Sequence, residues 1–118
     1  MSDFQIYHNP RCSKSRQTLA LLVEHGVEPR IIEYLKHAPS AAALRDVVRK
    51  LGIKPAELVR KGEEIYKQKY AGKTLSDAEW IDAMVEDPVL IERPIVIRGE
   101  RAVIGRPPEN VQRLIEQQ

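Results

Sequence analysis

The chain has 118 residues and a formal net charge of +2, from 19 basic and 17 acidic side chains. A chain of this length is expected to form one domain, residues 1–118, which excludes a second catalytic domain. Hydrophobic residues make up 42% and charged residues 31%, a composition typical of a folded soluble protein. The near balance of charge argues against nonspecific binding to nucleic acid, which requires an excess of basic side chains.

The sequence shows neither a targeting segment nor a membrane span. Residues 1–3 are not a basic stretch followed by an apolar run, and no 18 consecutive residues are apolar. We therefore expect a cytoplasmic protein with no membrane partner. Cys12 is the single cysteine, which excludes an internal disulfide and a multi-thiolate metal site and fits a reducing compartment.

The first predicted strand covers residues 4–7, where apolar and polar side chains alternate. Residues 8–10 (His-Asn-Pro) end it, because proline cannot continue a strand ladder and asparagine favours turns. Apolar residues at helical spacing then predict a helix from Ser13 to a glycine cap at Gly26. A β-rich run at residues 30–35 completes a βαβ unit with two parallel strands.

The middle of the chain is predicted to be helical. One helix is expected between an N-cap at Ser40 and a C-cap at Gly52, and Pro55 can start a short helix through Arg60. The capping-box sequence that begins at Ser76 predicts a further helix to about residue 87. Residues from about 36 to 90 are thus expected to be a helical insertion.

The end of the chain is predicted to return to strands. Residues 95–97 and 102–104 suit a hairpin across Gly99, and a last helix is expected after Pro107 and Pro108. The predicted fold class is therefore α/β, with a mixed four-stranded sheet in the order βαβ…ββα and a central helical insertion.

Cys12 lies between the first strand and the helix that follows it, where exposed amides and the helix dipole favour an anion. A lone cysteine is more often a buried structural residue. Here its neighbours in sequence are all polar, which favours a reactive thiolate; they are Arg11, Ser13, Lys14, Ser15 and Arg16.

Several other chemistries fail on spacing. A C-x-x-C redox pair is absent because Ser15 occupies the second position, although its hydroxyl could hydrogen-bond the thiolate. A phosphatase loop would need arginine where Thr18 stands. No metal site is expected, since the three histidines lack ligand spacing with the cysteine: His8, His25 and His37. What remains is a thiolate that attacks a substrate and is released by an external reductant.

Four segments of the sequence together carry a family resemblance. In order and spacing they resemble the glutaredoxin-dependent arsenate reductases across nearly the whole chain: residues 7–16 together with 18–19, then 58–61, 92–96 and 104–107. The resemblance implies a thioredoxin-like fold with a helical insertion, in agreement with the elements predicted above. It also implies that Cys12 is the catalytic nucleophile and that Pro94 is the cis-proline beside it.

The resemblance further implies that Arg60, Arg93 and Arg106 bind the substrate oxyanion. Guanidinium groups bind tetrahedral oxyanions through paired, charge-assisted hydrogen bonds and also favour a nearby thiolate. For His8 two interpretations stay open, an imidazolium that lowers the thiol pKa or a histidine that ends the first strand and bonds to backbone. His8, Ser15 and Pro94 are the expected supporting residues.

The implied reaction is the reduction of arsenate to arsenite through a thiol-arsenate adduct on Cys12. Glutathione would reduce the adduct and glutaredoxin would resolve it, with no bound cofactor. Arg11 and Lys14 add positive charge beside the cysteine where well-known members carry smaller residues. One alternative is an Spx-like regulator that binds RNA polymerase, against which the missing second cysteine and the three arginines favour the reductase. The closer alternative is a glutathione-dependent thiol transferase of unknown substrate.

Overall fold

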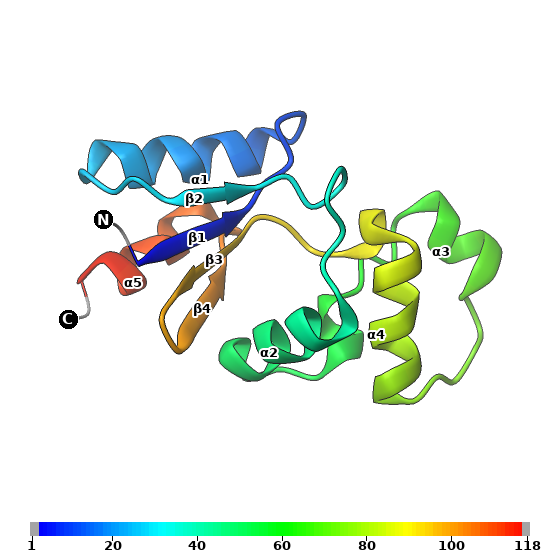
Figure 1. Ribbon diagram of the computed structural model, residues 1–118. Helices are drawn as coiled ribbons and strands as arrows, with labels where there is room; N and C mark the ends of the chain where they lie inside the picture. The colour runs from blue at the N-terminus through cyan, green and yellow to red at the C-terminus, as the bar shows by residue number, and fades with distance from the viewer. Residues whose placement is uncertain (1–2, 117–118) are drawn as a thin grey trace. The chain divides into compact units, whose positions relative to one another are not determined.

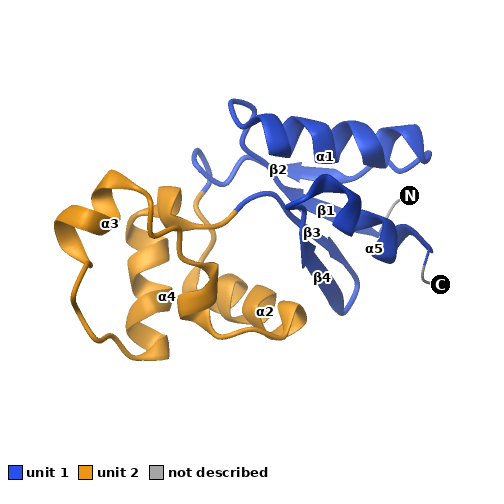
Figure 2. Cartoon of the chain, turned by 180° about the vertical axis from the view of Figure 1, so that it is seen from behind, with its two compact units in different colours: residues 1–37, 93–118 blue, residues 38–92 orange. Residues whose placement is uncertain are grey.

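The computed structural model describes residues 3–116, and these form two compact units. Figure 2 shows the first unit, residues 3–37 and 93–116 of the described part, in blue and the second, residues 38–92, in orange. The chain leaves the first unit once, builds the second and returns. Among the described residues, no helix combines the length and the apolar character needed to cross a membrane.

The first unit is built on a mixed four-stranded sheet (Figure 1). Its strands are β1 (Phe4–Tyr7), β2 (Arg30–Ile32), β3 (Ile95–Arg98) and β4 (Arg101–Ile104), in the order β2-β1-β3-β4. β1 runs parallel to β2 and antiparallel to β3, and β3 and β4 form an antiparallel hairpin. The predicted mixed sheet is confirmed. Gly99 occupies the hairpin turn with φ of 59°, a conformation that glycine adopts without steric penalty.

The second strand is shorter than the sequence predicted. β2 ends at Ile32, whereas the prediction extended it to residue 35. The amides of Lys36 and His37 both donate to the carbonyl oxygen of Glu33, at 2.9 and 3.0 Å. These hydrogen bonds form a turn within residues 33–37 and not a ladder with a neighbouring strand, so residues 33–35 leave the sheet. The prediction for these three residues was wrong.

One face of the sheet carries the core of the first unit. Helix α1 (Ser13–Glu24) and the C-terminal pair η3 (Pro108–Val111) and α5 (Gln112–Glu116) supply its helical side. The buried side chains come from strands and helices alike: Phe4, Ile6, Leu22, Val96, Val111 and Leu114. The helix predicted after Pro107 is therefore present as a 3-10 turn continued by a short α-helix.

The second unit is helical. It contains α2 (Ala41–Leu51), η1 (Pro55–Leu58), α3 (Glu64–Lys69), α4 (Asp77–Glu86) and η2 (Pro88–Leu90). The helices expected after Ser40 and Ser76 are confirmed, and both serines cap their helices by accepting a backbone N–H. The short helix begins at Pro55 as predicted but ends at Leu58, before Arg60. α3 and η2 were not predicted.

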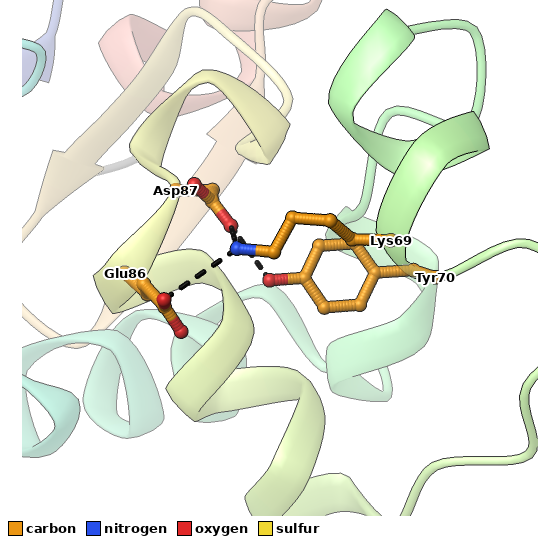
Figure 3. A network of polar contacts seen from close by, with 4 residues as sticks. All are labelled: Lys69, Tyr70, Glu86 and Asp87. Carbon is orange, nitrogen blue, oxygen red and sulfur yellow. Dashed lines mark hydrogen bonds and ion pairs between the residues drawn. The ribbon is translucent and has the colours of Figure 1, made fainter.

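A polar network joins the end of α3 to the end of α4 within the second unit (Figure 3). The Tyr70 hydroxyl donates to Asp87 Oδ2 at 2.6 Å, and Lys69 Nζ donates to the same oxygen at 2.9 Å. Lys69 also pairs with Glu86 at 3.5 Å. The centroids of the Trp80 ring of α4 and the Tyr70 ring lie 6.1 Å apart, so an aromatic contact between the same segments accompanies the network.

Candidate active site

Cys12 is the N-cap residue of α1, the first helix of the sheet unit. Its backbone is extended, with φ of −92° and ψ of 123°, and its carbonyl accepts the Arg16 amide at 3.0 Å. The Cys12 amide donates to the carbonyl oxygen of Asn9 at 3.0 Å, which closes the loop between β1 and the helix. The residue is 8% exposed. The thiol thus lies where the free amides of the first helical turn can reach it.

The environment of Cys12 favours its thiolate. Burial raises the pKa of the thiol, but the nearby backbone amides of Ser15 and Lys14 and the Arg106 side chain, which donates to the sulfur, together lower it by more. The positive charge of Arg106 adds to them. The pKa of Cys12 therefore lies below its ordinary value, and a larger fraction of the thiol is ionised near neutral pH.

Arg106 is the arginine that contacts the nucleophile. Its Nη2 donates to Cys12 Sγ at 3.6 Å. Its Nε donates to the carbonyl oxygen of Arg93 at 2.8 Å, and this bond orients the guanidinium. The segments that carry Cys12, Arg93 and Arg106 are far apart in sequence and meet within the sheet unit.

The loops that hold Arg93 and Arg106 pack tightly against the start of α1. The Arg93–Pro94 peptide bond is cis, as the family resemblance implied, and so is the Arg106–Pro107 bond, which was not expected. Gly105 joins both loops, since its amide donates to the carbonyl oxygen of Pro94 at 2.8 Å.

Thr18 and Gly105 are site-forming residues that sequence reasoning did not single out. The Thr18 hydroxyl is buried and lies within donating distance of two carbonyl oxygens, those of Lys14 at 2.8 Å and Gly105 at 3.2 Å. A Cβ on Gly105 would lie 2.7 Å from Thr18 Oγ1 and 2.9 Å from Pro94 Cγ. Only glycine fits this approach without a shift of its neighbours. The signal available in the sequence was a glycine directly before a candidate arginine.

His8 and Ser15 form a buried pair beneath the cysteine loop. His8 Nδ1 lies 2.7 Å from Ser15 Oγ, and the Asn9 amide donates to the same oxygen at 3.0 Å. Burial is the main cause that lowers the pKa of His8, and Arg16 adds to it, while Glu33 opposes it. A neutral imidazole whose Nδ1 accepts the Ser15 hydroxyl proton fits this distance and leaves the Ser15 oxygen to accept the Asn9 amide.

This pairing differs from what the sequence suggested for both residues. The Ser15 hydroxyl is engaged by His8 and Asn9, and it is the backbone amide of Ser15 that lowers the pKa of the thiol. His8 is buried and its pKa is lowered, which disfavours the imidazolium considered from the sequence. The structure agrees better with the other interpretation, a histidine that ends the first strand. Its ring, however, pairs with the Ser15 side chain and not with backbone.

Arg93 and Arg60 belong to different units of the chain. Arg93, in the sheet unit, has its side-chain Nε and Nη1 atoms buried and contributes its carbonyl to Arg106. Arg60 lies in the helical unit, where its amide donates to the Leu90 carbonyl at 2.7 Å. Its guanidinium faces two carboxylates, with Nη1 2.9 Å from Glu63 and Nε 3.2 Å from Glu92. Convergence of all three arginines on one anion stays a prediction.

The site contains no evident metal centre. Among residues 3–116, no three side chains of the metal-binding types gather closely enough to hold an ion. The arrangement instead offers a nucleophilic sulfur, a guanidinium in contact with it and the amides of a helix N-terminus. Such a set can bind an oxyanion and attack its central atom.

Comparison with known proteins places the chain in a family. The family model described as the ArsC family matches residues 7–114, and this match includes Cys12 and all three candidate arginines. The chain belongs to the ArsC family. An arsenate reductase of Haemophilus influenzae is 49% identical to this ArsC-family chain over 108 residues, which cover 90% of the chain and 93% of the relative.

Two further comparisons agree. The uncharacterised protein YfgD of Escherichia coli K12 is 51% identical over 113 residues, covering 94% of this chain and 95% of that protein. The solved structure of an arsenate reductase from Vibrio cholerae matches with a TM-score of 0.90 and 46% identity, over 93% of this chain and 95% of that one. The thioredoxin-like fold expected from the sequence is thereby confirmed.

Proposed function

We propose that this ArsC-family protein is an arsenate reductase that forms a covalent adduct on Cys12 and takes its electrons from glutathione and glutaredoxin. The observation that carries the proposal is the contact between Cys12 Sγ and Arg106 Nη2 at the N-terminus of α1. Arsenate reductases are among the relatives at 37–49% identity. A cationic group beside a nucleophilic sulfur suits an anionic substrate whose central atom is attacked by that sulfur.

The proposed substrate site uses the three arginines. Arg106 would hold an arsenate oxygen beside the sulfur, and Arg93 and Arg60 would bind the remaining oxygens. Guanidinium donors also stabilise the negative charge that gathers on those oxygens as the sulfur–arsenic bond forms. No bound cofactor is part of this proposal.

The first two proposed steps leave arsenic pentavalent. The Cys12 thiolate forms a bond to arsenic while an arsenic–oxygen bond breaks, and the hydroxide that leaves takes up a proton to become water. Glutathione then condenses with the adduct in the same way. Its sulfur bonds to arsenic, a second arsenic–oxygen bond breaks and a second water leaves.

The reduction falls at the glutaredoxin step and not at the glutathione step expected from the sequence, because formation of the glutathione–arsenic bond with loss of water transfers no electron pair to arsenic. A glutaredoxin thiolate attacks the sulfur of the arsenic-bound glutathione. A mixed disulfide of glutathione and glutaredoxin forms, and the electron pair of the broken sulfur–arsenic bond stays on arsenic, which becomes trivalent. Water then displaces Cys12 from arsenic, so that the thiol is regenerated and arsenite is released. The net reaction consumes arsenate and two thiols and yields arsenite, one disulfide and one water.

The lone cysteine supports the need for external thiols. The chain contains no second cysteine that could attack the adduct. Ser15, three residues after Cys12, uses its hydroxyl to bond His8 and accept the Asn9 amide. Because the proposed reductants are held reduced in the cytoplasm, we propose that compartment for the protein.

The test is arsenite production from arsenate with glutathione and glutaredoxin supplied. Cys12→Ser is expected to abolish it, whereas Gln17→Ala, an exposed change on the same helix, should retain the wild-type rate. Reduction of a small mixed disulfide without arsenite production would contradict the proposal and identify a thiol transferase. Residual arsenite production by Cys12→Ser would also refute it.

The arginine roles are tested by single alanine variants in the same assay. Loss of one charged hydrogen-bond donor is expected to lower kcat/KM for arsenate by about 10- to 100-fold. An unchanged kcat/KM for the Arg60, Arg93 or Arg106 variant would remove that residue from the site.

A further inference from the structure

A pocket of about 420 Å³ lies beside the cysteine loop in the sheet unit. One wall is formed by the loop after β1 and the other by the turn after β2; the lining residues are His8, Asn9, Pro10, Arg11, Glu33, Leu35 and Lys36. Its size falls within the range of about 300–1,000 Å³ common for small-molecule sites. The contacts described for Cys12 and Arg106 lie outside this lining, so the pocket is additional to the oxyanion site.

The lining carries both signs of charge with an excess of positive charge. Arg11 and Lys36 contribute two cations and Glu33 one carboxylate. Lys36 Nζ and Glu33 Oε1 lie 3.6 Å apart, and their side chains are 73% and 39% exposed, so both can turn to a ligand. Leu35 adds an exposed apolar side chain. This lining complements a small ligand with more carboxylates than ammonium groups.

The pocket adjoins the nucleophile along the chain. Arg11, in its wall, directly precedes Cys12, and consecutive Cα atoms are only about 3.8 Å apart. The loop is held in shape by the Arg11 amide, which donates to Asn9 Oδ1 at 3.0 Å, and by the Cys12 amide, which donates to the Asn9 carbonyl. A ligand held in this pocket therefore contacts the same loop that carries Cys12.

We infer that this pocket binds the low-molecular-weight thiol that attacks the Cys12 adduct, and that this thiol is a small peptide with two carboxylates and one ammonium group. The inference rests on the proposed function, because that function requires an external thiol. Arg11 and Lys36 bind the carboxylates of the peptide thiol and Glu33 binds its ammonium. Its sulfur then forms the second bond to arsenic, with loss of water, as in the proposed reaction.

The pocket distinguishes the two thiols of that reaction. A small peptide thiol with this charge pattern fits the pocket lining, whereas the thiol of a protein reductant is carried on a surface too large to enter it. The pocket therefore predicts ordered selectivity: the small thiol is recognised by its carboxylates and ammonium, and the protein thiol follows.

Binding is tested first without turnover, using S-methylglutathione as an unreactive probe. In an NMR titration of the intact protein, saturable shifts are expected for the amides of Asn9, Arg11, Leu35 and Lys36. Lys36→Glu should weaken binding about five- to tenfold, while Arg30→Glu, an exposed charge reversal on β2 outside the pocket, should change it less than about twofold. Shifts confined to other residues, or equal weakening by both variants, would overturn the inference.

Kinetics with arsenate then separate this inference from the proposed function. Lys36→Glu is expected to raise KM for glutathione about five- to tenfold, with KM for arsenate and the rate with dithiothreitol, which has no carboxylates, within about twofold of wild type. Arsenite production with an unchanged KM for glutathione would refute the pocket assignment alone. Saturable probe binding at the pocket without arsenite production would refute the reductase and leave the pocket assignment standing.

Discussion

Replacement of Gly105 by alanine tests how the site is assembled. The residue follows β4 and directly precedes Arg106. Its added Cβ would lie 2.7 Å from Thr18 Oγ1, 2.9 Å from Pro94 Cγ and 3.0 Å from Thr18 Cγ2. Favourable contacts between such atoms lie near about 3.5–4.0 Å, so each distance is short by at least about half an ångström. Thr18 and Pro94 are buried, and the Thr18 hydroxyl is already bonded, so they cannot simply turn away.

The expected cost follows from this overlap. Extra methyl groups in packed positions destabilise proteins by about 1–3 kcal/mol. For 118 residues the unfolding entropy makes each kcal/mol equivalent to about 4 °C in Tm, so Gly105→Ala should lower Tm by about 4–12 °C. The strain lies next to Arg106, whose contact with Cys12 Sγ is 3.6 Å. Displacement of that guanidinium should raise the pKa of the Cys12 thiol.

Thermal unfolding and the pH dependence of alkylation by iodoacetamide measure the two effects. Gly62→Ala is the matched control, because a Cβ at Gly62 has no atom within 4 Å and the residue has no positive φ. Combining Gly105→Ala with Thr18→Ala should reduce the additional loss of stability, since two of the three short contacts disappear. A Gly105→Ala protein with the Tm and alkylation profile of wild type would refute the close-packing argument.

Three other changes test single interactions. Arg106→Ala should shift the alkylation midpoint of Cys12 to higher pH, because a donor to the thiolate and its charge are lost. Burial lowers the pKa of His8, so the unfolded state binds more protons and wild-type stability should fall as pH drops below about 6.5. In denaturant titrations, His8→Gln should lose the part of this pH dependence that comes from the histidine. Tyr70→Phe should cost about 1–2 kcal/mol at pH 7, because a hydrogen bond to the Asp87 carboxylate is lost. The pKa of Asp87 is lowered: burial raises it, but the bonds from Tyr70 and Lys69 outweigh burial. The Tyr70→Phe deficit should therefore shrink as pH falls through the titration of this carboxyl.

Matched controls separate these effects from general damage. Arg30→Ala removes an exposed arginine of the same unit and should leave the alkylation midpoint in place. His25→Gln removes an exposed histidine, and Tyr66→Phe alters the other tyrosine beside Trp80. Equal behaviour of any variant and its control would contradict the corresponding assignment.

Elements with a buried face were predictable from the sequence, and those without one were not. The helix after Ser40 was expected because it buries Leu44, Val47 and Val48 at helical spacing. α3 (Glu64–Lys69) buries no residue, so its sequence carries no apolar periodicity that a prediction could use. The end of β2 was misplaced for a related reason. Residues 33–35 are compatible with a strand in composition, and only the turn closed by the Lys36 and His37 amides on the Glu33 carbonyl removes them from the sheet.

The same distinction applies to the site. Cys12 was identifiable because a strand, a break and a helix surround it within a few residues. The contact of Thr18 with Gly105 joins residues 87 positions apart, and no local pattern encodes it. The His8–Ser15 pair is closer in sequence, but its form depends on burial, which lowers the pKa of the imidazole and so favours its neutral form beside the serine hydroxyl.

Two candidate arginines of this nearly neutral chain, Arg106 and Arg60, have different surroundings. Arg106 is oriented by a carbonyl and contacts the cysteine sulfur, so its charge acts on the nucleophile even before a substrate binds. Arg60 is held by Glu63 and Glu92, and an anion that binds it has to compete with those carboxylates. Arg106 therefore acts on the thiol in the free protein, and its proposed role in oxyanion binding would add to that action, whereas Arg60 would bind an oxyanion in competition with two carboxylates. We therefore expect the pKa of the Cys12 thiol to depend on Arg106 and not on Arg60, whereas arsenate binding can depend on both.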